Sequence, residues 1–364
     1  MKYKYPVYQP SLKGNEKKYV NECLDSTWIS SKGRFISDFE SEFAKYIKVK
    51  YAIAVPNGTI ALHLALLALG IGKGDEVIVP TLTYIASANA VKYAGAEPVF
   101  ADSLYDTWQI DPSDIRKRIT KKTKAIMPVH LYGYACEMDE IKKIANEHNL
   151  IIIEDCAEAF GTKYKNKHVG NFGSASTFSF FGNKTITTGE GGMVVMNNKK
   201  LFEHAVHLKG QGLANNREYW HDIIGYNYRM TNICAAIGLA QLERADKLIN
   251  NKRKIAKWYD SFLEPLPVIT QEEKKNIFHS YWMYNILVEK SKLRDKLREH
   301  LKKHGIETRP MFFPLHTMTM YYNKNVRLPV AEDIAGRGIN LPSYPDLTKS
   351  DIEYISSKIR DFFN

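Results

Sequence analysis

Short apolar runs alternate with amphipathic stretches over the first half of the chain. Runs rich in Val, Ile and Ala occupy residues 51–55, 77–79, 97–100, 124–129 and 150–154. Helical patterns occupy residues 59–69, 83–94, 111–119 and 138–148. Apolar runs of this length, alternating with helices, are typical of strands buried on both faces of a parallel sheet. We therefore predict an α/β fold in which helices sandwich a mostly parallel sheet.

The second half of the chain has a different pattern of predicted strands and helices. Strands are predicted at 193–196, 281–288 and 306–311, and helices at 293–304 and 349–363. Between these parts, residues 231–263 have one long helical periodicity. This pattern indicates a smaller α+β unit at the C-terminal end, joined to the first by the long helix.

These patterns predict two domains. We expect a large domain at residues 1–245 and a small C-terminal domain at residues 246–364. Residues 1–29 are able to pack on the small domain. The length of 364 residues is ample for two hydrophobic cores.

Lys184 stands between a predicted strand at 177–181 and a polar turn that ends in glycines. A lysine held out of bulk water at the end of a strand has a nucleophilic amine, which suits a Schiff base. A lone lysine in such a turn is more often a solvated surface residue. The neighbouring motifs favour the chemical interpretation.

Asp155 ends the apolar run at 150–154, where the strand ends of an α/β sheet carry chemistry. In an enzyme that uses pyridoxal phosphate, an aspartate at this place keeps the pyridine nitrogen protonated. An N-cap for the next helix is the structural alternative, and both roles can hold together.

The segment Asn57-Gly58-Thr59 joins the first strand to an Ala- and Leu-rich helix. Backbone N–H groups at Gly58 and Thr59, the Thr59 hydroxyl and the helix dipole all favour a phosphate at this helix start. Helix capping alone would also explain these residue types.

Thr59, Asp155 and Lys184, in this order, resemble the corresponding motifs of the fold-type I pyridoxal phosphate enzymes, and among them the DegT/DnrJ sugar-nucleotide aminotransferases. The resemblance covers nearly the whole chain. It extends to residues 28–33, 83–90, 225–232 and 308–316. It implies a fold-type I aminotransferase that uses pyridoxal phosphate, with pyridoxamine phosphate as its amino-carrying form. It also implies L-glutamate and a nucleotide-linked ketosugar as substrates.

The resemblance also implies roles for individual residues. Lys184 would be the catalytic lysine that anchors the cofactor, and Glu158 would contact the cofactor hydroxyl. Ser179 would bind the phosphate together with Gly58 and Thr59. Asn227 would reach the phosphate from the neighbouring subunit, which makes the enzyme a homodimer with shared active sites.

Tyr84 would stack on the cofactor ring, although packing in the core is the alternative. Several further positions match segments that line the nucleotide-sugar pocket in relatives, and each has a structural alternative such as aromatic packing, turn hydrogen bonding or a surface ion pair. They are Trp28, Ser30, Arg229, His316 and Tyr321.

Residues 156–161 and 180–184 are most similar to family members that aminate GDP-4-keto-6-deoxy-D-mannose at C4, which supplies a 4-amino sugar nucleotide for O-antigen synthesis. GDP is therefore the favoured nucleotide. A UDP- or dTDP-linked ketosugar and amination at C3 stay open. Dehydratases of the same fold carry histidine at the position of Lys184, so the lysine favours amino transfer. A non-catalytic binding protein is disfavoured by the pair of Asp155 and Lys184.

Composition adds few constraints. The formal net charge of +11 suits an anionic ligand, but basic residues are scattered and no nucleic-acid motif occurs. The four cysteines form no CxxC pair, and no histidine pair lies in an HExxH frame, so we expect no metal. The start lacks an apolar signal segment, and no apolar run is long enough to span a bilayer. We expect a cytoplasmic enzyme without nucleic-acid or membrane partners.

Overall fold

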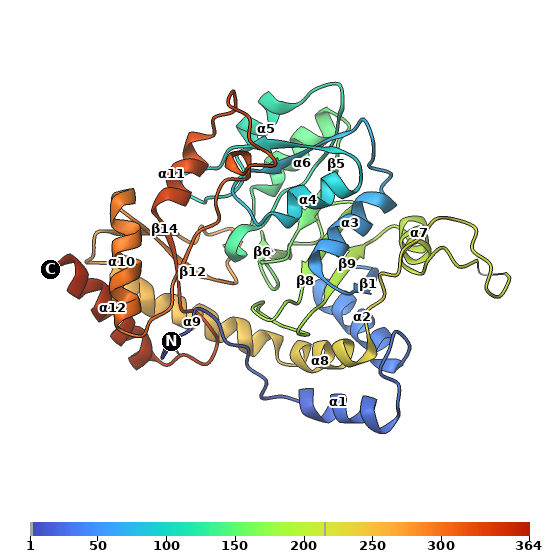
Figure 1. Ribbon diagram of the computed structural model, residues 1–364, viewed down its shortest axis with the longest axis horizontal. Coiled ribbons are helices and arrows are strands. Elements are labelled where there is room, and N and C mark those ends of the chain that lie inside the picture. Colours follow the sequence, from blue (N-terminus) through green and yellow to red (C-terminus); the bar gives the residue numbers. More distant parts are fainter. Residues whose placement is uncertain (1–2, 215) are drawn as a thin grey trace.

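A computed structural model describes residues 3–214 and 216–364. Its centre is a seven-stranded sheet in the order β1-β9-β8-β5-β4-β2-β3 (Figure 1). The strands of this sheet are β1 (Tyr51–Val55), β2 (Glu76–Pro80), β3 (Glu97–Ala101), β4 (Thr123–Ile126), β5 (Ile151–Asp155), β8 (Ala175–Ser179) and β9 (Gly192–Met196). The five strands predicted in the first half are all present, with ends shifted by at most a few residues.

The direction of the strands agrees with the predicted mostly parallel sheet. Neighbours from β3 through β2, β4 and β5 to β8 are parallel, whereas β9 is antiparallel to both β8 and β1. Only β9 therefore runs against the others. The carboxyl ends of β1, β5 and β8 consequently lie at one edge, where ligands of α/β sheets bind.

Helices cover both faces of this sheet. Helices α3 (Gly58–Ala68), α4 (Ala86–Tyr93) and α7 (Lys199–Lys209) contribute to one buried apolar cluster, which includes Ile53 and Val77 of the strands. Helices α2 (Arg34–Ile47), α6 (Met138–Glu147) and α8 (Asn232–Leu242) contribute to another, which includes Ala52 and Ile78. Successive strand residues thus point to opposite cores, as the period of two in a strand requires.

A second, antiparallel sheet has the order β10-β12-β14-β13. Its strands are β10 (Val268–Thr270), β12 (Tyr284–Val288), β13 (Arg309–Pro310) and β14 (Gly338–Leu341). It shares a core with helices α9 (Ala245–Leu263), α10 (Ser291–Lys303) and α12 (Lys349–Phe363). Tyr5 bridges to Ile306 beside this sheet. The proposed domain division at residue 245 falls between the two sheets.

The remaining elements are short or connect the larger ones. They are α1 (Glu16–Asp25), α5 (Pro112–Arg118), α11 (Pro329–Arg337), the 3-10 turns η1 (Leu131–Gly133) and η2 (Leu315–Thr317), and a small sheet of β6 (Lys163–Tyr164), β7 (Lys167–His168) and β11 (Ile277–Phe278). Within the described residues, no helix combines the length and apolarity needed to cross a membrane.

Three predicted elements differ from the structure. The helix predicted at 231–263 is two helices, α8 and α9, because the chain turns at Glu243 and Arg244. The Arg244 guanidinium donates to the Ser11 carbonyl at this turn, so a distant segment fixes the break. The strand predicted at 177–181 is β8, which ends at Ser179, and the strand predicted at 306–311 is only the two residues of β13.

Candidate active site

Lys184 lies in the turn that follows β8, at the carboxyl edge of the sheet. Its side chain is 14% exposed, and its Nζ lies 3.9 Å from Glu158 Oε1 and 3.9 Å from the centre of the Trp282 ring. The backbone around it is fixed, because Trp282 Nε1 donates to the Asn183 carbonyl and Tyr8 donates its hydroxyl to the Lys184 carbonyl. The sequence-predicted lysine is therefore enclosed by side chains and is not a solvated turn residue.

Asp155 is buried at the end of β5. Its Oδ2 accepts a hydrogen bond from Ser87 Oγ at 2.8 Å, and its Oδ1 accepts one from the Ala157 N–H at 3.0 Å. Burial raises the pKa of the carboxyl, and the two hydrogen bonds and the charge of Lys184 oppose that rise. The alternative that Asp155 caps a helix is wrong, because β5 is followed by turns and then by β6, and its bond to Ala157 belongs to the first of these turns. A cation brought to this carboxylate would favour its charged form.

Glu158 faces Lys184 from the turn after β5. Its Oε2 accepts from the Tyr132 N–H at 2.8 Å, and the side chain is buried. Burial raises the pKa of Glu158 and lowers the pKa of Lys184, while the attraction between the two charges opposes both shifts. Each group is therefore moved towards its neutral form, and the charge of each affects the pKa of the other.

The predicted phosphate-binding residues converge at the start of α3. Asn57 Oδ1 accepts from the Ile60 N–H, and the first helical backbone bond runs from Ala61 to the Asn57 carbonyl. These bonds leave the N–H groups of Gly58 and Thr59 directed out of the helix start. A Cβ on Gly58 would lie 2.8 Å from Ser179 Cβ, so the absence of a side chain is what allows β8 to approach this helix.

A row of aromatic rings lies beside Lys184. The rings of Trp282 and Tyr132 are parallel within 10° with centres 6.0 Å apart, and Tyr132 in turn stacks on Phe312 at 5.4 Å. Tyr84, next in the row, has its ring centre 5.7 Å from that of Phe312 and is 57% exposed. This exposure excludes the alternative that Tyr84 packs in the core, and leaves its ring free to stack on a ligand.

The sequence interpretation did not single out Ser87, Tyr132 or Trp282. Ser87 lies on α4, Tyr132 on η1, and Trp282 directly before β12. Each approaches the site from a separate part of the chain, so no local spacing indicates them. The one local signal is that Trp282 follows the aromatic Tyr281 at the start of a predicted strand.

Trp28 and Ser30 lie between α1 and α2 and contact Asn232, the first residue of α8. Asn232 donates its side-chain amide to the Trp28 carbonyl at 2.7 Å and its N–H to the Ser30 carbonyl at 2.6 Å. Both side chains are exposed, as are those of Asn227 and Arg229, where Arg229 Nε donates to Asn227 Oδ1 at 3.0 Å. The contacts of these four residues within the chain do not join them to Lys184.

His316 and Tyr321 make contacts within the chain. His316 is 3% exposed; its Nδ1 lies 2.8 Å from Thr81 Oγ1 and its Nε2 lies 3.0 Å from Glu332 Oε1. Tyr321 donates its hydroxyl to Asn89 Oδ1 at 2.8 Å. A sugar contact by His316 would require it to release one of its two partners, and both assignments to the substrate pocket stay predictions.

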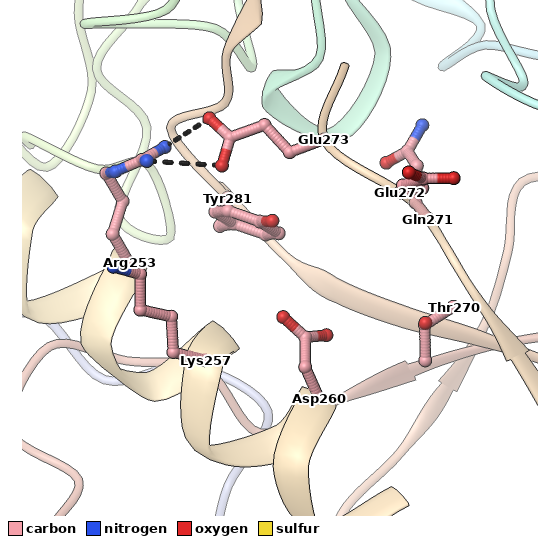
Figure 2. A pocket seen from close by; sticks show the side chains of 8 residues that line it. All are labelled: Arg253, Lys257, Asp260, Thr270, Gln271, Glu272, Glu273 and Tyr281. Atoms are coloured by element: carbon pink, nitrogen blue, oxygen red, sulfur yellow. Dashed lines mark hydrogen bonds and ion pairs between the residues drawn. The ribbon is translucent and has the colours of Figure 1, made fainter. Parts of the chain in front are cut away.

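Two other features of the molecule have some properties of a binding site. His130, Glu154 and Cys156 lie close enough for a metal, but His130 Nδ1 accepts from the Cys136 N–H and its Nε2 meets Glu154, so the imidazole has no free lone pair. A surface pocket of about 270 Å³ lies beside α9 (Figure 2). Its Arg253 is already paired with Glu273 at 2.7 Å. The pocket is also open to solvent at Lys257 and Glu272, which are both exposed, whereas Lys184 is enclosed by other side chains.

The groups at the sheet edge fit one kind of ligand. An amine that can attack a carbonyl carbon, a buried carboxylate, a helix start and an exposed aromatic ring together suit a planar aromatic aldehyde that carries a phosphate. Pyridoxal phosphate has this chemistry, and the cradle at Gly58, where a side chain would collide with Ser179, supports the fit.

Comparisons with known proteins agree with this chemistry. The sequence profile of the DegT/DnrJ/EryC1/StrS aminotransferase family matches residues 10–360. The chain is 62% identical to GDP-perosamine synthase of Escherichia coli O157:H7 over 100% of both chains. It is 51% identical to GDP-perosamine synthase of Vibrio cholerae over 99% of both. The putative sugar aminotransferase Spr1654 from Streptococcus pneumoniae, solved in its PMP form, superposes with a TM-score of 0.93 at 27% identity and covers 98% of each chain.

Proposed function

Because the chain belongs to the DegT/DnrJ/EryC1/StrS aminotransferase family, we propose that it transfers an amino group from L-glutamate to C4 of GDP-4-keto-6-deoxy-D-mannose, with pyridoxal phosphate as cofactor. The product is GDP-perosamine. The observation that carries this proposal is the identity of more than half of all residues, over the full chain, to two proteins named GDP-perosamine synthase.

The residues at the sheet edge would hold the cofactor. Gly58 and Thr59 would bind its phosphate through backbone N–H groups, together with the Ser179 hydroxyl. Asp155 would hold the proton of the pyridine nitrogen, and Glu158 would bind the ring hydroxyl. When bound, pyridoxal phosphate supplies an electron sink for the carbanion formed at the carbon that gains or loses the amino group.

Lys184 would anchor the cofactor and then transfer protons. Once displaced by the amino donor, its Nζ would move a proton between the substrate carbon and C4′ of the cofactor, in one direction with the amino donor and in the reverse direction with the ketosugar. Burial favours the neutral amine that this task requires, because it lowers the pKa of Lys184 towards the working pH. Trp282 and Glu158 hold the amine in place and limit the access of water.

Replacement of Lys184 tests its anchoring and catalytic roles. Lys184→Ala should bind the cofactor without covalent attachment and lose at least about a hundredfold in turnover, the lower range of general acid–base catalysis. Borohydride reduction followed by peptide mass spectrometry identifies the attached residue. Near-normal turnover in Lys184→Ala would contradict both roles.

The identity of the substrate is tested separately. Purified protein is incubated with glutamate and GDP-, UDP- or dTDP-linked 4-ketosugars, and the products are read by mass spectrometry and NMR. We expect amine formation at C4 with the GDP-linked sugar at a rate well above the others. A preference for UDP or dTDP would overturn the proposed nucleotide, and loss of a hydroxyl without gain of an amine would overturn amino transfer.

The complete site is proposed to need two subunits. The segment between α7 and α8 includes a loop of residues 211–214 and 216–224, which extends beyond α7 and away from the central sheet (Figure 1). This segment carries Asn227 and exposes large apolar side chains, with Tyr219 93% exposed and Ile224 91% exposed. Such apolar exposure favours a protein contact, which would place Asn227 at the phosphate of the partner subunit.

Mixing a variant at Lys184 with a variant at Asn227 tests this shared site. Lys184→Ala and Asn227→Ala protomers are unfolded together and refolded as a mixture. A hybrid dimer regains one site with both residues intact, so random reassortment should restore about a quarter of the sites. Mixtures as inactive as the two parents would contradict the shared site. Each variant refolded alone is the control.

A further inference from the structure

Among the described residues, only Trp282 places an aromatic face over the Lys184 amine. The distance from Nζ to the ring centre is 3.9 Å, well within the range of an attractive cation–π contact. The same indole donates its Nε1–H to the Asn183 carbonyl at 2.7 Å. One side chain thus contacts both the amine and the backbone next to it.

The approach of Trp282 depends on unusual backbone geometry. Tyr132 has φ 56°, Gly133 has φ 94° and Tyr281 has φ 51°. A Cβ on Gly133 would lie 2.8 Å from the Trp282 backbone nitrogen, so glycine is required for this approach. Non-glycine residues with positive φ persist where surrounding contacts hold them, and they cluster at functional sites.

Hydrogen bonds hold this junction between the two parts of the chain. The Gly133 carbonyl accepts from the Ser280 N–H at 3.1 Å and from the Thr162 hydroxyl at 2.6 Å. The Thr162 and Ser280 hydroxyl oxygens lie 2.8 Å apart. Trp282 is therefore brought to the lysine by a closed network and not by a flexible loop.

The positive φ of Tyr281 also separates two neighbouring side chains. Tyr281 lines the surface pocket beside Arg253 (Figure 2), whereas Trp282 faces Lys184. On its other side Trp282 stacks on Tyr132, whose N–H donates to Glu158. The indole therefore contacts the Lys184 amine directly and Glu158 through Tyr132.

We propose that Trp282 is a positioning residue for Lys184, whose indole face stabilises the protonated amine and whose Nε1–H fixes the lysine turn. This inference rests on the proposed role of Lys184. Trp282 itself transfers no proton in this assignment, since its Nε1–H is engaged with Asn183.

The test compares Trp282→Leu, which loses both contacts, with Trp282→Phe, which keeps an aromatic face but loses the donor. The proton affinity of the Lys184 amine is measured in full-length, cofactor-free protein by competitive acetylation at several pH values and peptide mass spectrometry. We expect the affinity to fall by about 2- to 30-fold in Trp282→Leu, as loss of a cation–π contact implies, and by less in Trp282→Phe. An affinity equal to or above that of the wild type in Trp282→Leu would overturn the proposal.

A second measurement addresses the lysine turn. Hydrogen exchange of residues 181–187 in the cofactor-loaded protein should be faster in both variants, because both lose the bond to Asn183. If Trp282→Leu fails to fold, the exchange rate of residues 181–187 in Trp282→Phe is the deciding measurement. A rate equal to that of the wild type in this variant would overturn the proposal. Trp258→Leu, on α9, is the matched control and should change neither measurement.

The two proposals fail in different ways. If wild-type protein attaches pyridoxal phosphate at a residue other than Lys184, the proposed function is wrong. If attachment at Lys184 is normal and Trp282→Leu leaves its amine and turn unchanged, only the positioning role is wrong.

Discussion

Burial governs the protonation of the two groups that face one another in the site. Lys184 and Glu158 are both held away from water, and each is moved towards its neutral form. Their separation of 3.9 Å is beyond a direct hydrogen bond but close enough for strong electrostatic coupling. A change in the charge of one residue should therefore be measurable in the other.

Glu158→Gln tests this coupling at the residue scale. The substitution keeps the shape of the side chain but removes the carboxylate charge that raises the pKa of Lys184. We expect the pKa of the Lys184 amine to fall by about 1 to 3, the usual effect of losing an opposite charge nearby. Competitive acetylation measures it. Glu40→Gln, whose carboxylate pairs with Lys209, is the control. An unchanged pKa of the Lys184 amine in Glu158→Gln would indicate that Glu158 is already neutral in the wild type.

His168 is buried far from the reaction chemistry and affects stability. Burial lowers its pKa from 6.5 to about 4, so between these values the unfolded chain binds a proton that the folded chain does not. The free energy of unfolding should therefore decrease as the pH falls from 6.5 to 4, by at most about 1.4 kcal/mol per pH unit for this one group.

Replacing this histidine should weaken the acid dependence. His168→Gln is expected to reduce the slope of unfolding free energy against pH between pH 4 and 6.5, measured by urea denaturation at each pH. His148→Gln, at an exposed helix end, should leave the slope unchanged. Equal slopes in wild type and His168→Gln would show that His168 is not the responsible group.

At the scale of elements, helix α3 and strand β8 form one unit at the sheet edge. Gly58 begins α3 at the point where β8 ends at Ser179. Gly192 of β9 packs tightly against the same turn, because a Cβ on Gly192 would lie 2.5 Å from the Asn57 carbonyl oxygen. Three elements thus meet at a point where two of them, α3 and β9, contribute glycines and the third, β8, contributes Ser179. This close packing is what brings backbone donors and a serine hydroxyl to one point.

Gly58→Ala tests the cradle. The added Cβ would lie 2.8 Å from Ser179 Cβ, a contact that neither backbone can easily relieve. Overpacking of this kind costs about 1–3 kcal/mol of folding stability. If the helix start moves to relieve it, the N–H groups of Gly58 and Thr59 leave their place at the phosphate, so we expect the dissociation constant for pyridoxal phosphate to rise about tenfold, or about 1.4 kcal/mol. Absorbance titration measures it. Gly182→Ala, where no atom lies within 4 Å of the new Cβ, is the control. Wild-type affinity in Gly58→Ala would remove this cradle as the phosphate site.

At the scale of the whole molecule, the two sheets meet around the lysine turn. Tyr8, from the N-terminal segment, and Trp282, from the segment that enters β12, hold the carbonyls of Lys184 and Asn183. Asp102, at the end of β3, accepts from the Val330 and Ala331 N–H groups at the start of α11. The site is therefore assembled from both parts of the chain.

Association should depend on the segment beyond α7. Ile224→Asp places a charge on a side chain that is 91% exposed, so it should fold normally but weaken the proposed dimer. Sedimentation velocity over a range of concentrations measures the change. Leu12→Asp, also at an exposed apolar position, is the control. An unaltered dimer in Ile224→Asp would move the interface away from this residue.

The amino-acid sequence by itself determined the βα alternation, the position of Asp155 at the edge of the sheet and the position of Lys184 in the turn after a strand. These features depend on apolar periodicity and turn chemistry over a few residues, which act locally. The resemblance to one family rested on the same local motifs.

Tertiary structure alone decided which distant groups surround the lysine. Trp282 follows Lys184 by almost a hundred residues, and its approach requires positive φ at Tyr132 and Gly133. The antiparallel course of β9 and the break between α8 and α9 likewise depend on partners far along the chain. These features follow from strand pairing and contacts between segments far apart in the chain, which the apolar periodicity within a single segment does not indicate.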